Sequence, residues 1–441
     1  MPNSEEKNTI SVVGAGLAGS ECALQLAHRG FKVVLYEMRA VKQTPAHKTT
    51  DFAELVCSNS FGSQSEVSAP GLLKWEAAQM GSFILKTAQD FAVPAGQALG
   101  IDRERFAVAV SALVKNHPNI TVKNEVIESI DQVPRPTVIA TGPLTDEALA
   151  TSLQKHFGDE FLYFFDAIAP IIDADSINKD IAWKADRYDK GTPDYYNCPM
   201  DKEQYFNFIN EIKAARKIEP KHFETTEFFE GCMPIETMID RGDQTLRFGP
   251  MKPVGLTNPK TGRYPFAAVQ LRQDNKEATA YNIVGFQTRM AYGEQTRIFK
   301  MIPGLENAEF LKLGSIHRNM FINTPKRLNK DLSSKNDPWL FFAGQITGVE
   351  GYFESTCIGL LVARFIEQKL KDQTFSPPPR DTALGSLLEA ITDPFREKNF
   401  QPTNINFGLI PPWPDESLRD KKEKKIKQVH RAQEALRSWN Q

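Results

Sequence analysis

The sequence predicts an α/β fold, in which a Rossmann-like dinucleotide-binding domain is assembled from both ends of the chain and an α+β domain is inserted between them. Three observations support this fold class. A strand, a glycine-rich turn, a helix and a second strand fill the first fifty residues. Another strand and glycine-rich turn lie near residue 344, and the aromatic middle of the chain differs in character from both ends.

The first glycine-rich turn has the pattern G-x-G-x-x-G. It follows the apolar run 10–13, opens a helical pattern, and is followed by a second apolar run, 32–36, which ends at Glu37. In a βαβ unit the first glycine permits a tight turn, the second lets the backbone approach a pyrophosphate at a helix N-terminus, and the third lets helix and strand pack closely. The acid can accept hydrogen bonds from a ribose. The predicted contacts are Gly14, Ala15, Gly16, Leu17, Ala18, Gly19, Glu37 and Arg39. The alternative is a glycine-rich turn without a ligand.

The rest of the first segment completes this domain. A stretch rich in Ser, Thr, Pro and Gly covers 43–71, and helical patterns cover 72–90 and 101–117. Short strands are expected at 120–122 and 126–130. The apolar strand from Thr137 ends in Thr141-Gly142, a strand end that lies against the cofactor in doubly wound flavoproteins.

The middle of the chain reads as an α+β substrate domain. Segments 161–175 and 223–286 are aromatic and rich in short β-like runs with frequent Pro and Gly turns, and a helix is expected over 201–217.

Nucleotide-fold character returns at 339–345. An apolar strand, the glycine-rich turn 346–352 and a helix at 355–369 resemble the second cofactor segment of two-part flavoproteins. Gln345 stands where an Asp often contacts the ribityl chain. Because an extended FAD is held by both halves of such a domain, the split favours a Rossmann-like FAD-binding domain over one for free NAD. The further predicted contacts are Thr141, Gly142, Gly344, Gln345, Gly351 and Tyr352.

These patterns divide the chain into four parts. Residues 1–160 and 319–414 form the FAD-binding domain, 161–318 the inserted substrate domain, and 415–441 a basic C-terminal helix. The helix carries lysines interspersed with acids, so it is either a solvated face or an RNA contact.

Composition narrows the class of protein. With 441 residues, of which 41% are hydrophobic and 24% charged, the chain has the balance of a globular protein that is soluble in water. A net charge of −2 excludes a polycation, so nucleic-acid contact requires local basic surface. We expect a cytoplasmic protein with no membrane partner, because neither a secretory signal nor a bilayer-length apolar run is visible. The five cysteines form no C-x-x-C pair, so neither a disulfide nor a structural metal is expected.

Two cysteines are candidates for catalysis. Cys57 lies in a loop after the first βαβ unit, at the edge where doubly wound sheets open onto their ligand, and Cys232 lies in a turn between Gly231 and Pro234. A thiol needs a nearby base or cation to react well near neutral pH. Cys22 and Cys357, which lie among small apolar residues of helices, are expected to be inert and buried, and Cys198 to be structural.

Several segments resemble the folate- and FAD-dependent tRNA uracil-5-methyltransferases, the TrmFO family. The likeness runs in order from about residue 10 to 412, through the first glycine-rich turn and the segments 55–61, 230–236, 344–352 and 401–408. The resemblance implies that methylenetetrahydrofolate supplies a one-carbon unit, that reduced FAD carries it to C5 of the uridine at position 54 in the tRNA T loop, and that NADPH or NADH reduces the FAD again.

The resemblance also assigns roles to the two thiols. Uracil C5 is a poor nucleophile until a group adds to C6, and a thiolate suits that addition; Cys232 takes this role. Cys57 captures or protects the flavin methylene, or acts as an acid or base at the target carbon. The folate is expected to stack on the flavin near Tyr352 and Asn319.

The RNA contacts must come from Lys and Arg, because phosphates dominate the affinity for RNA. The candidates are Arg247, Lys252, Arg263, Arg289, Lys326 and Arg327. Three other functions stay open: the same chemistry on a ribosomal RNA uridine, a small-molecule FAD oxidoreductase, and a non-enzymatic flavin-bearing RNA-binding protein.

Overall fold

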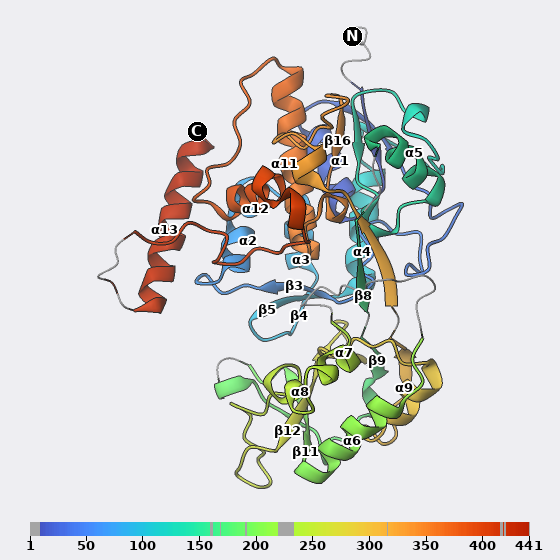
Figure 1. Cartoon of the computed structure of the whole chain (residues 1–441), viewed down its shortest axis with the longest axis vertical. Helices are drawn as coiled ribbons and strands as arrows, with labels where there is room; N and C mark the ends of the chain where they lie inside the picture. Colours follow the sequence, from blue (N-terminus) through green and yellow to red (C-terminus); the bar gives the residue numbers. More distant parts are fainter. Residues whose placement is uncertain are drawn as a thin grey trace.

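The computed structural model describes residues 9–158, 162–167, 169–189, 192–218, 233–314, 316–414, 418 and 420–440. A five-stranded, all-parallel sheet forms the centre of the upper part of Figure 1. Its strands are, in spatial order, β16 (Leu340–Phe342), β7 (Thr137–Ile139), β1 (Thr9–Val13), β2 (Lys32–Tyr36) and β6 (Ile120–Lys123). Strands β16 and β7 are neighbours in the sheet although about 200 residues separate them in the sequence. The sheet therefore takes strands from both ends of the chain, and the predicted fold class is confirmed.

Two helices pack closely against each other beside this sheet. Helix α1 (Leu17–His28) follows the first glycine-rich turn, and α11 (Tyr352–Leu370) follows the second. A Cβ atom added at Gly359 of α11 would lie 2.2 Å from the carbonyl oxygen of Ala18, so only glycine allows this approach. Arg29 and Glu367 form an ion pair of 2.8 Å between the two elements.

Two buried glutamates accept hydrogen bonds from the first N–H groups of other helices. Glu21 of α1 accepts the N–H groups of Phe83 and Ile84 in α3 (Phe83–Asp90) at 3.2 and 2.8 Å. Glu76 of α2 (Ala69–Gln79) accepts those of Ala383 and Leu384 in α12 (Ala383–Thr392), both at 2.8 Å. These N–H groups have no partner inside their own helix, and each buried carboxyl group therefore ties a distant helix to the core.

Two expectations about the first segment are wrong in detail. The helix expected over 72–90 is two helices, α2 and α3. Gly81 between them has a φ of +72°, and the Ser82 side chain caps α3 by accepting the N–H of Leu85. No strand forms at 126–130, because Ser129 and Gln132 build a capping box that starts a 3₁₀ turn at Ile130. The helix expected at 101–117 is α4 (Arg103–Lys115), and α5 (Glu147–Phe157) follows β7.

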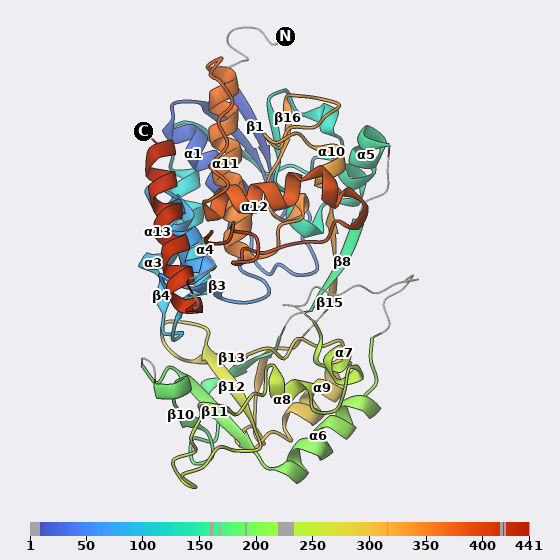
Figure 2. The same cartoon turned by 60° about the vertical axis from the view of Figure 1, so that its left-hand side comes forward.

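The inserted segment forms a six-stranded antiparallel sheet in the lower part of Figures 1 and 2. Its strands are, in spatial order, β10 (Trp183–Lys184), β11 (Tyr195–Met200), β12 (Ala267–Gln273), β13 (Ala280–Ile283), β9 (Ile171–Asp173) and β14 (Phe310–Lys312). Its helices are α6 (Lys202–Ala214), α7 (Ile235–Asp240), α8 (Thr245–Phe248) and α9 (Tyr292–Phe299). The α6 helix fits the one expected over 201–217.

An antiparallel ribbon of β8 (Leu162–Ala167) and β15 (Ile316–Phe321) connects the two parts (Figure 2). A small sheet of β3 (Ser60–Ser63), β5 (Ala98–Ile101) and β4 (Ala92–Val93) lies at the lower edge of the upper part, toward the inserted segment (Figure 1).

The C-terminal helix α13 (Lys421–Trp439) lies on the outside of the upper part (Figure 1). It is the basic helix expected over 415–441, of which 415–417, 419 and 441 lie outside the described residues. Several of its cations lie over aromatic rings, among them Lys425 over Phe407 at 5.2 Å and Arg437 over Trp75 at 5.5 Å. Part of its charge therefore serves to dock the helix. None of the described helices is both long and apolar enough for a membrane span.

Candidate dinucleotide cleft and the Cys57 loop

The carboxyl ends of three neighbouring parallel strands open onto one cleft. Gly14 follows β1, Thr141 follows β7 and Gly344 follows β16, and all three line it. The cleft contains about 1050 Å³ of empty space. A crevice beyond the carboxyl ends of the strands is where open α/β sheets bind their ligands.

The three glycines of the first turn differ in how much space surrounds them. Gly14 has a φ of +100°, and a Cβ there would lie 2.6 Å from the carbonyl oxygen of Ala140. A Cβ at Gly19 would lie 1.8 Å from the carbonyl oxygen of Gly14, so helix α1 and the turn touch backbone to backbone. A Cβ at Gly16 would meet no atom within 4 Å. The backbone at Gly16, at the N-terminus of α1, therefore faces open space in the cleft, as an anion site requires.

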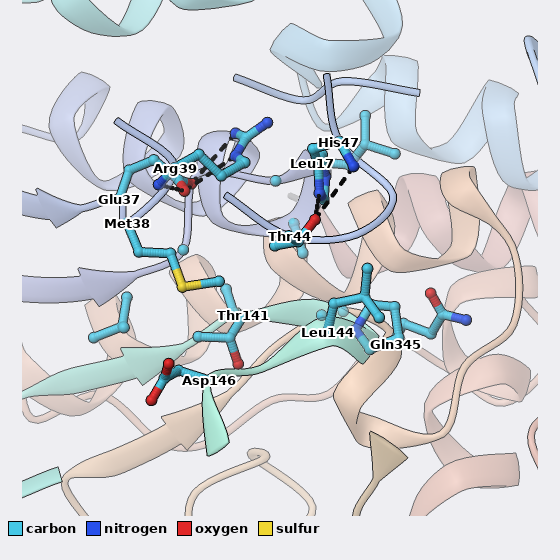
Figure 3. A pocket seen from close by; sticks show the side chains of 18 of the residues that line it. Leu17, Glu37, Met38, Arg39, Thr44, His47, Thr141, Leu144, Asp146 and Gln345 are labelled. Carbon is cyan, nitrogen blue, oxygen red and sulfur yellow. Dashed lines mark hydrogen bonds and ion pairs between the residues drawn. The ribbon is translucent and has the colours of Figure 1, made fainter. Parts of the chain in front are cut away.

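Glu37 and Arg39 form one wall of the cleft (Figure 3). The Glu37 carboxylate accepts the N–H of Ala15 at 2.8 Å and pairs with the Arg39 guanidinium at 3.0 Å. Burial works to raise the pKa of Glu37, but the charge and hydrogen bonds of Arg39 and the N–H of Ala15 outweigh it and hold that pKa below its ordinary value. Glu37 is therefore an ionised acceptor that is fixed to the glycine turn.

A loop between β2 and β3 supplies lining residues that sequence reasoning missed. Thr44 and His47 line the cleft, and the Thr44 hydroxyl lies 2.6 Å from His47 Nδ1 (Figure 3). Burial, and then the charge of Arg39, lower the pKa of His47 to about 4, so this imidazole is neutral at pH 7. Lys42 of the same loop pairs with Asp146, which lines the cleft. No periodic or motif signal marks these residues in the sequence.

Most of the residues predicted to contact the cofactor line the cleft. Three of them, Ala15, Gly19 and Gly351, do not. The lining residues are Gly14, Gly16, Leu17, Ala18, Glu37, Arg39, Thr141, Gly142, Gly344, Gln345 and Tyr352. The Gln345 side chain donates to Glu350 at 3.3 Å. Asn319, which sequence analysis placed near the folate, is buried in β15 and does not line the cleft.

Cys57 is half-buried and lies beside the cleft, although it is not one of the lining residues. Its backbone N–H donates to the Tyr352 hydroxyl at 2.6 Å. Tyr352 lines the cleft, as does Val56, the residue before the thiol. Two segments that are almost 300 residues apart thus place this cysteine beside the dinucleotide cleft. Cys232 lies outside the described residues.

The loop that carries Cys57 is also in contact with the inserted segment. Asn59 is fully buried, and its amide donates to the carbonyl oxygens of Gln273 and Asp274 at 3.0 and 3.2 Å. Arg272 donates to Asn59 Oδ1 at 3.1 Å, and Arg103 pairs with Asp274 at 2.9 Å. The Arg103 guanidinium also donates to the carbonyl oxygen of Leu55 at 2.8 Å. The end of β12 and the turn after it therefore help to fix the loop.

The other described cysteines are buried. Cys22, Cys198 and Cys357 are all inaccessible to solvent, as the small apolar neighbours of Cys22 and Cys357 predicted for those two. Burial, reinforced by nearby carboxylates, raises the pKa of each of these thiols. A thiol of this kind is inert. Among the described residues, no group of three or more His, Cys, Asp or Glu side chains is placed to hold a metal ion.

The RNA candidates differ in how much of their charge is available. The Arg247 guanidinium lies 3.6 Å from the Phe266 ring and donates to the carbonyl oxygen of Phe266 at 2.8 Å, so it serves internal packing. Lys252 and Arg263 are exposed.

The fold and the cleft define a dinucleotide-binding protein whose parallel sheet is built from two segments. Residues 9–374 match the family model described as "Glucose inhibited division protein A". The chain is 72% identical, over 440 residues and the full length of both chains, to the methylenetetrahydrofolate--tRNA-(uracil-5-)-methyltransferase TrmFO of Bdellovibrio bacteriovorus. It is 53% identical to the protein of the same name from Natranaerobius thermophilus, over 97% of each chain. The chain belongs to the TrmFO family.

Solved structures agree on the fold. GidA of Aquifex aeolicus superposes with TM-scores of 0.68 and 0.69 in two crystal forms, at 14% identity. These matches cover 100% and 98% of this chain and 74% and 76% of the GidA chains.

Proposed function

We propose that this chain is a methylenetetrahydrofolate-dependent tRNA (uracil-5-)-methyltransferase. It acts on the T-loop uridine at position 54 and uses FAD, with NADPH or NADH as the source of electrons. Its relatives at 72% and 53% identity carry the name of this activity. The observation that carries the proposal is the hydrogen bond from the Cys57 N–H to the hydroxyl of Tyr352, because Tyr352 and Val56, the residue before Cys57, both line the cleft.

The cleft has the features that an extended FAD requires. The open backbone at Gly16 and the N-terminus of α1 suit the pyrophosphate, and ionised Glu37 suits the ribose next to it. Thr141 and Gln345 line the part of the cleft formed by the other two strands, where they suit the rest of the cofactor. Bound FAD, together with the folate, supplies the one-carbon unit and the reducing equivalents.

The two thiols act on the uracil ring in this proposal. Addition of a thiolate to C6 makes C5 nucleophilic, and elimination of the same thiolate after the C5 proton is lost restores the ring. We assign the addition to Cys232. Cys57, beside the cleft, acts as acid or base at the target carbon or handles the one-carbon unit. We place the domain boundaries at 160, 318 and 414, with the inserted domain contacting tRNA, and the enzyme in the cytoplasm.

A single-turnover experiment tests this function. Purified protein with FAD, methylenetetrahydrofolate, NADPH and unmodified tRNA should form 5-methyluridine in the T loop, whereas Cys57→Ala and Cys232→Ala should lose this activity and keep FAD. Cys198→Ala is the matched control, because its thiol is buried in the inserted segment. Flavin reduction without tRNA methylation by the wild type would overturn the proposal, and methylation of ribosomal RNA alone would change the substrate.

A further inference from the structure

Lys312 belongs to the inserted segment, yet its side chain reaches the loop that carries Cys57. It is the last residue of the edge strand β14, and its ammonium donates to the carbonyl oxygen of Val56 at 2.8 Å. The register of β14 against β9 shifts between Phe310 and Lys312. Such irregularities re-aim a side chain, and they are over-represented next to active sites.

The surroundings of Lys312 make its charge costly. Burial lowers the pKa of this ammonium to about 8, and the charges of Arg103 and Lys48 act in the same direction. Cys57 and Glu54 act in the opposite direction. The neutral imidazole of His47 is also close enough to be affected by the Lys312 charge. A solvated surface lysine has no such environment, so the contact with Val56 calls for a reason beyond solubility.

We propose that Lys312 is a positioning residue, whose hydrogen bond from the inserted segment to Val56 fixes the loop that carries the Cys57 thiol beside the cleft. The catalytic consequence rests on the proposed function, whereas the positioning concerns only contacts within this chain. Arg103 holds the preceding carbonyl group, that of Leu55, and Tyr352 holds the following N–H, that of Cys57. The loop is thus fixed at three successive residues, and Lys312 provides the middle contact.

The pH dependence follows from the charge on the donor. Deprotonation leaves a neutral amine, which donates a weaker hydrogen bond than the ammonium, so methylation should decline as pH rises through about 8. Stability should change in the opposite direction. The folded pKa lies below the unfolded value of 10.5, so between these two values the unfolded chain binds more protons, and this group's contribution to stability increases with pH. A loss of activity together with a gain of stability separates loosening of the loop from unfolding.

Two variants and a control test the proposal. Lys312→Met should lower the single-turnover methylation rate about tenfold, as loss of one charge-assisted hydrogen bond predicts, without changing FAD content or the KM for tRNA. Lys312→Arg, which stays charged at every pH used, should stay within about threefold of wild type and lack the decline above pH 8. Lys276→Met is the control, because Lys276 is exposed and contacts Asp102 through its backbone N–H.

A second measurement needs neither folate nor tRNA. The rate at which iodoacetamide alkylates Cys57, followed by mass spectrometry of its peptide, should rise about threefold or more in Lys312→Met and stay unchanged in Lys276→Met. Wild-type rates of alkylation and methylation in Lys312→Met would overturn the proposal. If Lys312→Met does not fold, the methylation rates of Lys312→Arg and wild type are compared from pH 7 to 9.5. A ratio of these two rates that does not change with pH would also overturn the proposal. If alkylation changes while the wild type methylates no RNA, the positioning role stands and the proposed function fails.

Discussion

The dinucleotide cleft and the Cys57 loop lie next to each other but are held by different kinds of interaction. In the first turn of the cleft, backbone atoms approach so closely that Gly14 and Gly19 leave no room for a side chain. At the loop, the contacts come from the side chains of Arg103, Lys312 and Tyr352, which belong to three separate elements. A turn fixed by backbone contact tolerates almost no substitution, whereas a loop fixed by several side chains can lose its contacts one at a time.

The largest expected effect separates two glycines of the same turn. Gly19→Ala places a Cβ 1.8 Å from the carbonyl oxygen of Gly14 and should destabilise the fold by about 3 kcal/mol or more, since backbone on both sides must shift. A Cβ at Gly16 meets no atom within 4 Å, and Thr is an acceptable helix N-cap, so Gly16→Thr should fold normally and lose FAD. Urea unfolding and flavin absorbance measure the two effects. Equal stability losses in both variants would contradict the distinction.

The second prediction breaks the interface that fixes the loop. Arg103 and Asp274 have side chains only 12% and 9% exposed, so Asp274→Ala leaves a buried guanidinium without its carboxylate. Removal of one partner of a buried pair costs about 3–5 kcal/mol, and the exposure here places the loss near the lower figure. In a double-mutant cycle measured by urea unfolding, adding Arg103→Met to Asp274→Ala should restore much of the lost free energy of unfolding. Additive losses would show that the pair is not coupled.

The third prediction concerns Glu76, a buried carboxyl group that accepts two backbone N–H groups. Burial raises the pKa of Glu76 to about 8, although it accepts two N–H groups of α12. Between about 4.5 and 8 the folded protein keeps a proton that the unfolded chain has lost, so stability falls as pH rises through this window, by up to about 1.4 kcal/mol per pH unit. Glu76→Gln should lack this slope. The test is to measure the urea unfolding midpoints of wild type and Glu76→Gln at several pH values. If both midpoints change with pH in the same way, the slope does not come from Glu76.

The smallest effect is expected at Lys42, whose side chain is 58% exposed although it pairs with Asp146, a residue that lines the cleft. The Lys42 end of the pair is solvated, and Asp146 keeps the hydrogen bond that it accepts from the N–H of Ala148, so Lys42→Met should change the unfolding midpoint little. The loop should open more often, and FAD should dissociate a few-fold faster in a stopped-flow exchange experiment. Repetition at high salt provides the control, since screening should make wild type resemble the variant. Identical rates at low salt would show that the pair does not restrain the loop.

The same contrast explains which features could be predicted from sequence. The glycine turn, Glu37 and the second segment near Gly344 are local patterns whose spacing reflects backbone geometry, and the structure brings them into one cleft. Cys57 could be nominated from its place after the βαβ unit. The partners of its loop could not, because Lys312 lies more than 250 residues away and has no motif.

Errors within the first segment have a similar origin. Apolar periodicity continues through 72–90, but Gly81 and the cap at Ser82 divide it into two helices. Buried Glu21 and Glu76 look like ordinary charged helix residues in the sequence. Only the fold shows that each is paired with the start of another helix.

The pairing of β16 with β7 has a consequence for the order in which the protein is made. A ribosome releases β1, β2 and β7 first, then the whole inserted segment, and only afterwards β16 and α11, which complete the cleft. The inserted segment is contiguous and can form its own sheet during this interval. The nascent chain therefore exposes an unpaired edge of its parallel sheet for the time needed to synthesise some 200 residues, and tight binding of the cofactor must wait until translation is nearly finished.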